Sequence, residues 1–259
     1  MTSYYLIDKP LALQHAFYPD KTRSTCPDYA SDLLIRVQDD TYVSCRLFAS
    51  NPEYPTVLFF HGNGEVASDY DSIAPYFFKL CSVNLLVAEY RGYGASDGFP
   101  TFAGLIADAH RIFRNVSEEI SKMSFRKEIW VMGRSMGSVP ALELAASYPL
   151  EIPGMIIESG FPCATRIVRR HRIPIPESEL KIVEDECLQK LRRITIPSLI
   201  IHGERDSLVD IKEAYTIERE LSSAEKRIFI IPGADHNSVM VMDIDGYFKA
   251  IGDFIHTSR

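Results

Sequence analysis

A serine lies between two glycines in the sequence Gly133-Arg134-Ser135-Met136-Gly137. An apolar run, Glu128–Met132, leads into this motif, and a stretch with helical spacing, Met136–Tyr148, follows it. A serine at a strand-to-helix turn presents its hydroxyl at the helix N-terminus, where the helix dipole favours developing negative charge. Small residues on both sides allow the sharp bend that such a turn requires. The motif therefore predicts that Ser135 is a nucleophile.

A serine hydroxyl needs a base that removes its proton and a third group that orients this base. Asp206 comes shortly after the apolar run Ser198–His202, and His236 comes shortly after the run Arg227–Ile231. Loops that follow the carboxyl ends of parallel strands meet at one edge of a sheet, where open α/β sheets place their sites. We therefore predict a catalytic triad of Ser135, Asp206 and His236.

The elements that must position these residues can be predicted from hydrophobic periodicity. Six near-continuous apolar runs are typical of strands that are buried on both faces of a parallel sheet. Two earlier blocks, Leu33–Val37 and Tyr42–Phe48, have a short polar connection and predict an antiparallel pair at one sheet edge. The pattern indicates an α/β fold with a mostly parallel, eight-stranded sheet and helices on both faces. The six runs are Thr56–His61, Asn84–Glu89, Glu128–Gly133, Gly154–Glu158, Ser198–His202 and Arg227–Ile231, and the predicted helices are Phe102–Val116, Met136–Tyr148, Ile211–Leu221 and Val239–Ile255.

One connection, residues 161–196, is much longer than a simple crossover helix requires. We expect residues 162–196 to form a small cap insertion. Since no repeat or flexible linker divides the chain, this cap belongs to a single domain that spans residues 1–259.

The predicted cap is locally basic, with eight Lys or Arg residues against five Asp or Glu residues. If Arg166, Arg169 or Arg170 faces the cleft, the site favours an acidic or phosphorylated acyl donor. The alternative is a solvated or ion-paired helix face, which is the commoner arrangement of charged side chains.

The composition excludes several other classes of function. The chain has 259 residues and a formal net charge of −7, so it has no broad basic field for nucleic acid or anionic lipid. It lacks an apolar run long enough to span a membrane, and Asp8 and Lys9 interrupt the position of a secretory signal. The five cysteines have no CxxC spacing, which favours reduced thiols, a cytoplasmic location and no bound metal. They are Cys26, Cys45, Cys81, Cys163 and Cys187.

Two further motifs complete a resemblance to the α/β-hydrolases that extends from about Val57 to the C-terminus. His61-Gly62-Asn63-Gly64-Glu65 resembles the oxyanion loop of that family. The sequence Tyr90-Arg91-Gly92-Tyr93-Gly94-Ala95-Ser96 resembles the next loop in its serine-esterase and acyl-peptidase-like branches. The resemblance implies an α/β-hydrolase fold and a serine hydrolase. It also implies that the backbone N–H groups of Met136 and Asn63 bind the oxyanion.

The resemblance leaves the acid of the triad open, because some members of this fold use a position that corresponds to Glu158. We favour Asp206 over Glu158. For His61 and His202, which both precede a glycine at a strand end, we expect backbone positioning with hydrogen-bonded side chains and no catalytic role.

The expected reaction is cleavage of an ester, thioester or amide of a small to medium acyl substrate through an acyl-enzyme, with no cofactor. A non-catalytic binding module and an acyltransferase on the same fold are the alternatives, since a fold alone does not fix function.

Overall fold

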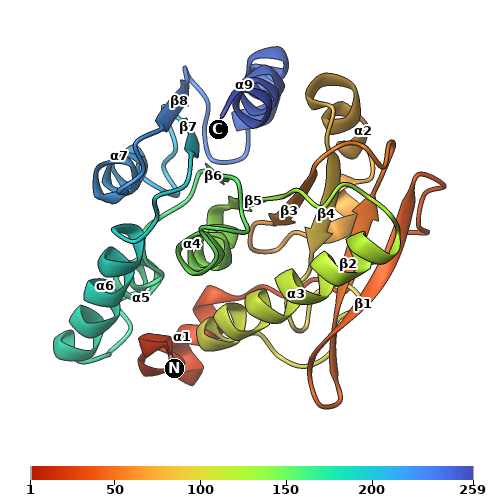
Figure 1. The fold of residues 1–259 in the computed structure, drawn as a ribbon. Helices are drawn as coiled ribbons and strands as arrows, with labels where there is room; N and C mark the ends of the chain where they lie inside the picture. The colour runs from red at the N-terminus through yellow and green to blue at the C-terminus, as the bar shows by residue number, and fades with distance from the viewer. Residues whose placement is uncertain (1, 259) are drawn as a thin grey trace.

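An eight-stranded sheet runs through the molecule, whose computed structural model describes residues 2–258 (Figure 1). The strands are β1 (Ala30–Gln38), β2 (Thr41–Phe48), β3 (Thr56–Phe60), β4 (Asn84–Ala88), β5 (Ile129–Arg134), β6 (Met155–Glu158), β7 (Ser198–Gly203) and β8 (Lys226–Ile231). Their order in the sheet is β1-β2-β4-β3-β5-β6-β7-β8. β1 pairs antiparallel with β2, and β2 pairs antiparallel with β4, whereas β3 to β8 are parallel to one another.

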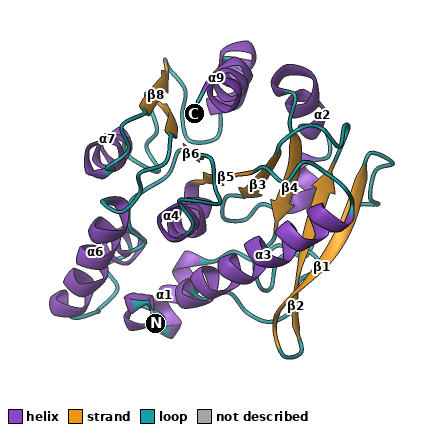
Figure 2. Cartoon of the chain, in the orientation of Figure 1, coloured by secondary structure: helices purple, strands orange, loops and turns teal. Residues whose placement is uncertain are grey.

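Helices cover both faces of the sheet, and each face has its own hydrophobic core (Figure 2). Leu58 and Phe59 of β3 lie in different cores, because successive side chains of a strand point to opposite faces. The first core includes residues of α1 (Pro10–Ala16), α3 (Phe102–Lys122), α4 (Ser138–Ser147), α5 (Thr165–Arg170), α6 (Glu177–Leu191) and α7 (Ile211–Glu220), and the second includes residues of α2 (Ala74–Tyr76), α8 (Val239–Met242) and α9 (Ile244–Thr257). Within residues 2–258, no helix combines the length and the apolar character needed to cross a bilayer.

The start of α3 illustrates how the sequence sets a helix boundary. The Oγ1 atom of Thr101 accepts a hydrogen bond from the N–H of Gly104 at 2.9 Å. The carboxylate of Asp8 accepts the N–H of Phe102 at 2.7 Å. These acceptors satisfy backbone donors that have no partner inside the helix. They also attach the N-terminal segment to the helix that covers this face of the sheet.

The predicted sheet is confirmed, including the antiparallel pair at its edge and the six parallel strands. The prediction of one helix over Val239–Ile255 is wrong, because the chain is interrupted between α8 and α9 at Asp243. This residue has a non-helical backbone (φ −150°, ψ 73°), and its carboxylate accepts the N–H of Gly246 at 3.0 Å. Asp243 therefore caps the start of α9 and cannot continue α8.

The N-terminal elements η1 (Ser3–Leu6) and α1 have no counterpart among the predicted elements. The side chain of Thr2 and the backbone N–H of Ser3 donate to the carboxylate of Glu186 in α6, at 2.8 and 2.7 Å. The N-terminal segment thus packs beside the region between β6 and β7, where the sequence predicts the cap. Two further short elements, η2 (Ala67–Tyr70) and η3 (Phe77–Cys81), lie between β3 and β4. A third, η4 (Ser135–Gly137), follows β5.

Candidate active site

Ser135 follows β5 directly and begins η4, which leads into α4. Its backbone lies in the left-handed region with φ 52°, a conformation that costs a non-glycine residue on the order of 1–3 kcal/mol. Close packing requires the glycines around it. A Cβ atom on Gly137 would overlap the carbonyl oxygen of Phe60, and a Cβ atom on Gly133 would overlap the carbonyl oxygen of Gly137. The chain therefore makes a sharp strand-to-helix turn with Ser135 at its apex.

His236 lies between Ser135 and Asp206. Its Nε2 atom is 3.0 Å from the Oγ atom of Ser135, and its Nδ1 atom is 2.7 Å from the Oδ2 atom of Asp206. All three residues are buried. Asp206 belongs to the loop after β7 and His236 to the loop after β8, so the parallel strands deliver all three side chains to one edge of the sheet. The structure thus brings the three residues of the predicted triad into one hydrogen-bonded line.

The carboxylate of Asp206 is fixed by more than its contact with His236. Its Oδ1 atom accepts the backbone N–H groups of Leu208 and Val209 at 2.9 and 2.7 Å. Burial opposes the charged form, but the hydrogen bonds from His236 and Val209 outweigh it and lower the pKa of Asp206. Asp206 is therefore an ionised acceptor that holds the Nδ1–H of His236 in place.

Glu158, the alternative acid, is engaged elsewhere. It ends β6 beside Arg134, its register partner in β5. Its Oε1 atom accepts from the Nε–H of Arg134 at 3.2 Å, and its Oε2 atom accepts from the hydroxyl of Tyr247 at 2.6 Å. No hydrogen bond joins Glu158 to His236 in the described part of the chain. Of the two acids that the sequence leaves open, Asp206 is the one that contacts His236.

Arg134 joins two loops of the site, a role that the sequence analysis missed. Its Nη2 atom donates to the carbonyl oxygen of His236 at 3.1 Å, and its Nη1 atom forms an ion pair with Glu65. The other oxygen of Glu65 accepts the backbone N–H of Gly62 at 2.7 Å. Burial opposes the charge of Arg134, but Glu65 and Glu158 raise its pKa. The only sequence signal is a charged residue at the end of a buried strand, which must find partners.

The predicted oxyanion donors, the N–H groups of Met136 and Asn63, belong to residues that line the same cleft as Ser135. Neither N–H has a hydrogen-bond partner within residues 2–258. The side chain of Asn63, by contrast, is hydrogen-bonded through both its oxygen and its nitrogen. Its Oδ1 atom accepts from the hydroxyl of Tyr93 at 2.6 Å and from the N–H of Tyr18 at 3.0 Å, and its Nδ2 atom donates to a carbonyl of α1 at 2.7 Å. These bonds fix Asn63 and leave its own N–H available.

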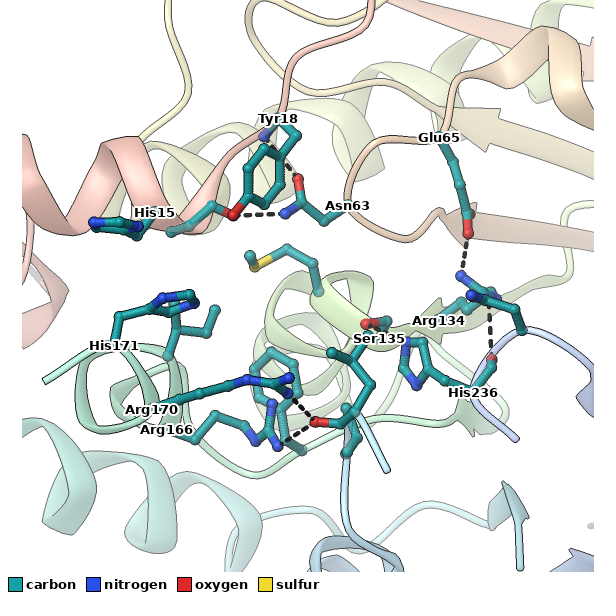
Figure 3. A pocket seen from close by; sticks show the side chains of 17 residues that line it. His15, Tyr18, Asn63, Glu65, Arg134, Ser135, Arg166, Arg170, His171 and His236 are labelled. Atoms are coloured by element: carbon teal, nitrogen blue, oxygen red, sulfur yellow. Dashed lines mark hydrogen bonds and ion pairs between the residues drawn. The ribbon is translucent and has the colours of Figure 1, made fainter. Parts of the chain in front are cut away.

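The site opens into a cleft of about 370 Å³ (Figure 3). This volume is typical of small-molecule sites. His15 and Tyr18 of the N-terminal segment form part of its wall, which the sequence analysis also missed. The available signal was Pro10, which favours the first turn of a helix, followed by small residues on one face of α1.

The three arginines considered for substrate binding differ in position. Arg166 and Arg170 line the cleft, whereas Arg169 does not. Arg169 forms ion pairs with Glu177 and Glu184 at 2.6 and 2.8 Å. Its position matches the alternative of an ion-paired helix face. The two interpretations of the basic segment therefore apply to different residues of the same short helix.

The histidines at the strand ends have structural contacts. The ring nitrogens of His61 contact the carbonyl oxygen of Gly62 at 2.7 Å and Glu89 at 3.0 Å, as expected for a positioning role. His202 meets the expectation at one ring nitrogen, since its Nε2 atom donates to the carbonyl oxygen of Val209 at 2.8 Å, but its buried Nδ1 atom has no hydrogen-bond partner among residues 2–258. Among the described residues, no group of three or more His, Cys, Asp or Glu side chains could hold a metal ion.

A family model, Hydrolase_4, described as serine aminopeptidase S33, matches residues 52–170 and 177–240. The chain belongs to this family. The resemblance to α/β-hydrolase serine hydrolases that its motifs predict is thereby confirmed. The matched part of the Hydrolase_4 chain contains Asn63, Ser135, Asp206 and His236, and it also contains α5.

Several known proteins are similar to this Hydrolase_4 member over most of its length. Protein bem46 of Schizosaccharomyces pombe is 29% identical over 232 residues, which are 85% of this chain and 73% of that protein. The human α/β hydrolase domain-containing protein 17B is 28% identical over 213 residues, which are 80% of this chain and 69% of that protein.

Solved structures share the fold at low sequence identity. The Pyrococcus furiosus esterase Pf2001 superposes with a TM-score of 0.74 at 20% identity and covers 93% of this chain and 98% of its own. Est1E of Butyrivibrio proteoclasticus, solved with ferulic acid bound, gives a TM-score of 0.70 at 18% identity and covers 87% and 98%. The predicted α/β-hydrolase fold is therefore confirmed.

Proposed function

We propose that this chain is a serine hydrolase that cleaves an ester, thioester or amide bond of a small to medium acyl substrate through an acyl-enzyme. Its membership of the Hydrolase_4 family supports hydrolase activity. The observation that carries the chemistry is the hydrogen-bonded line from Ser135 through His236 to Asp206, with distances of 3.0 and 2.7 Å.

In the proposed reaction, the Nε2 atom of His236 takes the proton of Ser135 as the Oγ atom attacks the substrate carbonyl carbon. Asp206 holds the Nδ1–H of His236 and stabilises the imidazolium that forms. The N–H groups of Met136 and Asn63 donate to the oxyanion of the tetrahedral intermediate. The intermediate then expels the alcohol, thiol or amine, which takes the proton from His236.

Water completes the proposed cycle. His236 removes a proton from a water molecule, and the oxygen of this water attacks the acyl carbon bonded to Ser135. The acid product leaves, and the Oγ atom of Ser135 recovers its proton from His236. The scheme requires no cofactor.

A hydrolase is favoured over a non-catalytic binding module by two features. Ser135 is held at φ 52°, and the N–H groups of Met136 and Asn63 have no partner within residues 2–258. Strained backbone and free N–H donors of this kind are typical of active sites. An acyltransferase would use the same residues and would differ only in the second nucleophile, so competing alcohols or amines in the assay distinguish it by its products.

The proposed partner is a small-molecule acyl substrate, with neither nucleic acid nor a membrane. The net charge of −7 supports this proposal. The five cysteines are free thiols, which supports the cytoplasmic location that we propose.

Hydrolysis of short p-nitrophenyl esters tests the proposal. We expect the parent protein to hydrolyse them and the Ser135→Ala variant to lose about 10⁴-fold or more in kcat. Ser121→Ala, which changes an exposed serine of α3, is the matched control and should keep full activity. Equal rates for the Ser135→Ala variant and the parent would overturn the assignment.

A further inference from the structure

The cleft has a cationic side that the proposed acyl transfer does not use. Figure 3 shows Arg166, Arg170 and His171 on the side of the cleft away from His236, with the arginine side chains extending toward Ser135. These residues come from α5 and from the position directly after it.

The charges on this side do not cancel. Arg166 forms an ion pair with Glu213 at 3.3 Å. Arg170 donates to the carbonyl oxygen of Leu208 at 2.8 Å, and no carboxylate within residues 2–258 forms an ion pair with it. Two guanidinium groups therefore lie on this side of the cleft, and within residues 2–258 only that of Arg166 has a carboxylate partner. The same cleft is also lined by Arg134, but two carboxylates, those of Glu65 and Glu158, more than offset its charge.

The two guanidinium groups are held in place before any ligand binds. Arg166 and Arg170 are four residues apart and so lie on one face of α5. Both donate to the carbonyl oxygen of Leu208, each at 2.8 Å. Arg166 also lies over the ring of Phe161, 5.2 Å from its centre. Two like charges fixed side by side in a partly enclosed cleft attract an anion, because an anion relieves their mutual repulsion.

Two histidines, His15 and His171, lie beside the arginines in the wall of the cleft. The rings of His15 and His171 stack with their centres 4.8 Å apart. Burial, together with the charges of His15 and Arg170, lowers the pKa of His171. The lowered pKa favours the neutral imidazole of His171, so Arg166 and Arg170 carry the positive charge on this side of the cleft.

We propose that Arg166 and Arg170 bind a carboxylate or phosphate group of the substrate while the bond to be cleaved lies at Ser135. This inference rests on the proposed function and adds the substrate class: an ester, thioester or amide with an anionic group. One cleft of about 370 Å³ is lined by both arginines and by Ser135, so a single small molecule can reach them all.

Matched pairs of esters test this proposal. The anionic group lies on the acyl side in mono-p-nitrophenyl adipate, whose neutral counterpart is p-nitrophenyl hexanoate. In the second pair, the anionic group lies on the alcohol side of 4-butyryloxybenzoate, and the neutral counterpart is the methyl ester of this benzoate. For at least one pair, the anionic-to-neutral ratio of kcat/KM should fall about tenfold in Arg170→Gln, because a charge-assisted hydrogen bond is lost. Raising the ionic strength should lower the ratio in the parent more than in this variant.

Arg169→Gln is the matched control, because it removes a neighbouring arginine of α5 that does not line the cleft. Its ratio should equal that of the parent. Arg166→Gln should act like Arg170→Gln. If neither of these two variants changes the ratio for either pair, the proposal is wrong.

A binding measurement separates this inference from the proposed function. Calorimetry on Ser135→Ala with monomethyl adipate should give a Kd about tenfold lower than on the Ser135→Ala/Arg170→Gln double variant. Equal affinities, or no binding to either protein, would overturn the inference even if neutral esters are hydrolysed at Ser135. Tight, Arg170-dependent binding without hydrolysis of any ester would support the anion site and contradict the proposed function.

Discussion

Arg134 donates a hydrogen bond from its Nη2 atom to the backbone carbonyl of His236 at 3.1 Å. Arg134 is the residue before the proposed nucleophile, so the strand that ends in Ser135 also fixes the loop of the proposed base. Through Glu65, the same guanidinium reaches the N–H of Gly62, next to the proposed oxyanion donor Asn63. One side chain thus links the three parts of the proposed catalytic machinery.

We predict that Arg134→Met lowers kcat for a neutral ester by about 10²-fold, because displacement of catalytic groups by about 1 Å has effects of this size. KM should change much less. Arg91→Met is the matched control, since Arg91 forms an ion pair with buried Asp108 at 2.7 Å outside the cleft. Both variants should lose thermal stability, but only Arg134→Met should lose kcat. Similar kcat losses in the two variants would assign Arg134 a purely structural role.

Asp206→Asn should lower kcat by about 10⁴-fold, because the neutral amide does not stabilise the imidazolium of His236 and permits its wrong tautomer. Glu158→Gln should have a far smaller effect, since Glu158 contacts Arg134 and Tyr247. Steady-state kinetics of both variants on one ester measure the difference. A large loss in Glu158→Gln alone would reverse the assignment of the acid.

Asn63→Ala removes the three side-chain hydrogen bonds that fix the proposed oxyanion loop. We expect kcat to fall by up to about 10²-fold, the loss that follows removal of one oxyanion donor. Asn84→Ala is a suitable control, because Asn84 is a buried asparagine that holds the loop at Ser50 and Asn51, outside the cleft. It should lose stability and keep its kcat. An unchanged kcat in Asn63→Ala would show that the loop does not depend on this side chain.

The stability of the fold should depend on Glu143, which forms an ion pair with Lys190 at 2.6 Å and contacts His110 at 3.2 Å. Burial opposes the carboxylate, but His110 and Lys190 lower the pKa of Glu143 to about 2. Because this value lies below that of the unfolded chain, the carboxylate adds stability above about pH 4.5, and this contribution is lost as the pH falls toward about 2. Glu143→Gln should lower the free energy of unfolding at neutral pH by about 3 kcal/mol, since Lys190 stays buried without its counter-charge.

Urea unfolding as a function of pH checks this prediction. The difference between the parent and Glu143→Gln should shrink by about 1.4 kcal/mol per pH unit below about pH 4.5. Glu151→Gln, at an exposed contact with Arg114, should match the parent throughout. A difference that stays constant down to about pH 3 would contradict the lowered pKa of Glu143.

The sheet and the positions of the proposed triad could be predicted because each depends on local sequence. Ser135, Asp206 and His236 each follow a strand with a clear apolar pattern, and parallel strands deliver their ends to one edge. The partners of Arg134 could not be predicted in this way. Glu65 and Glu158 lie far from it in sequence, and only the strand order and the loop conformations bring them together.

The roles of Arg166, Arg169 and Arg170 could not be predicted either, because they depend on how α5 packs against the rest of the fold. By spacing alone, both Arg169 and Arg170 lie on the helix face of Arg166, so the spacing does not show which of them meets the cleft. Which face meets the cleft is set by packing of α5 against α1. The sequence signal at Pro10 indicates a helix but not its location, because long-range contacts of Ala16 and Tyr18 with Asn63 place the N-terminal segment in the wall of the cleft.

Labelling with a fluorophosphonate tests the central claim most directly, because this reagent phosphonylates an activated serine and releases fluoride. Mass spectrometry of the labelled protein should find the adduct on Ser135, and His236→Ala should abolish the labelling because the base is lost. Absence of an adduct in the parent, or an adduct on another residue that persists in His236→Ala, would contradict the account.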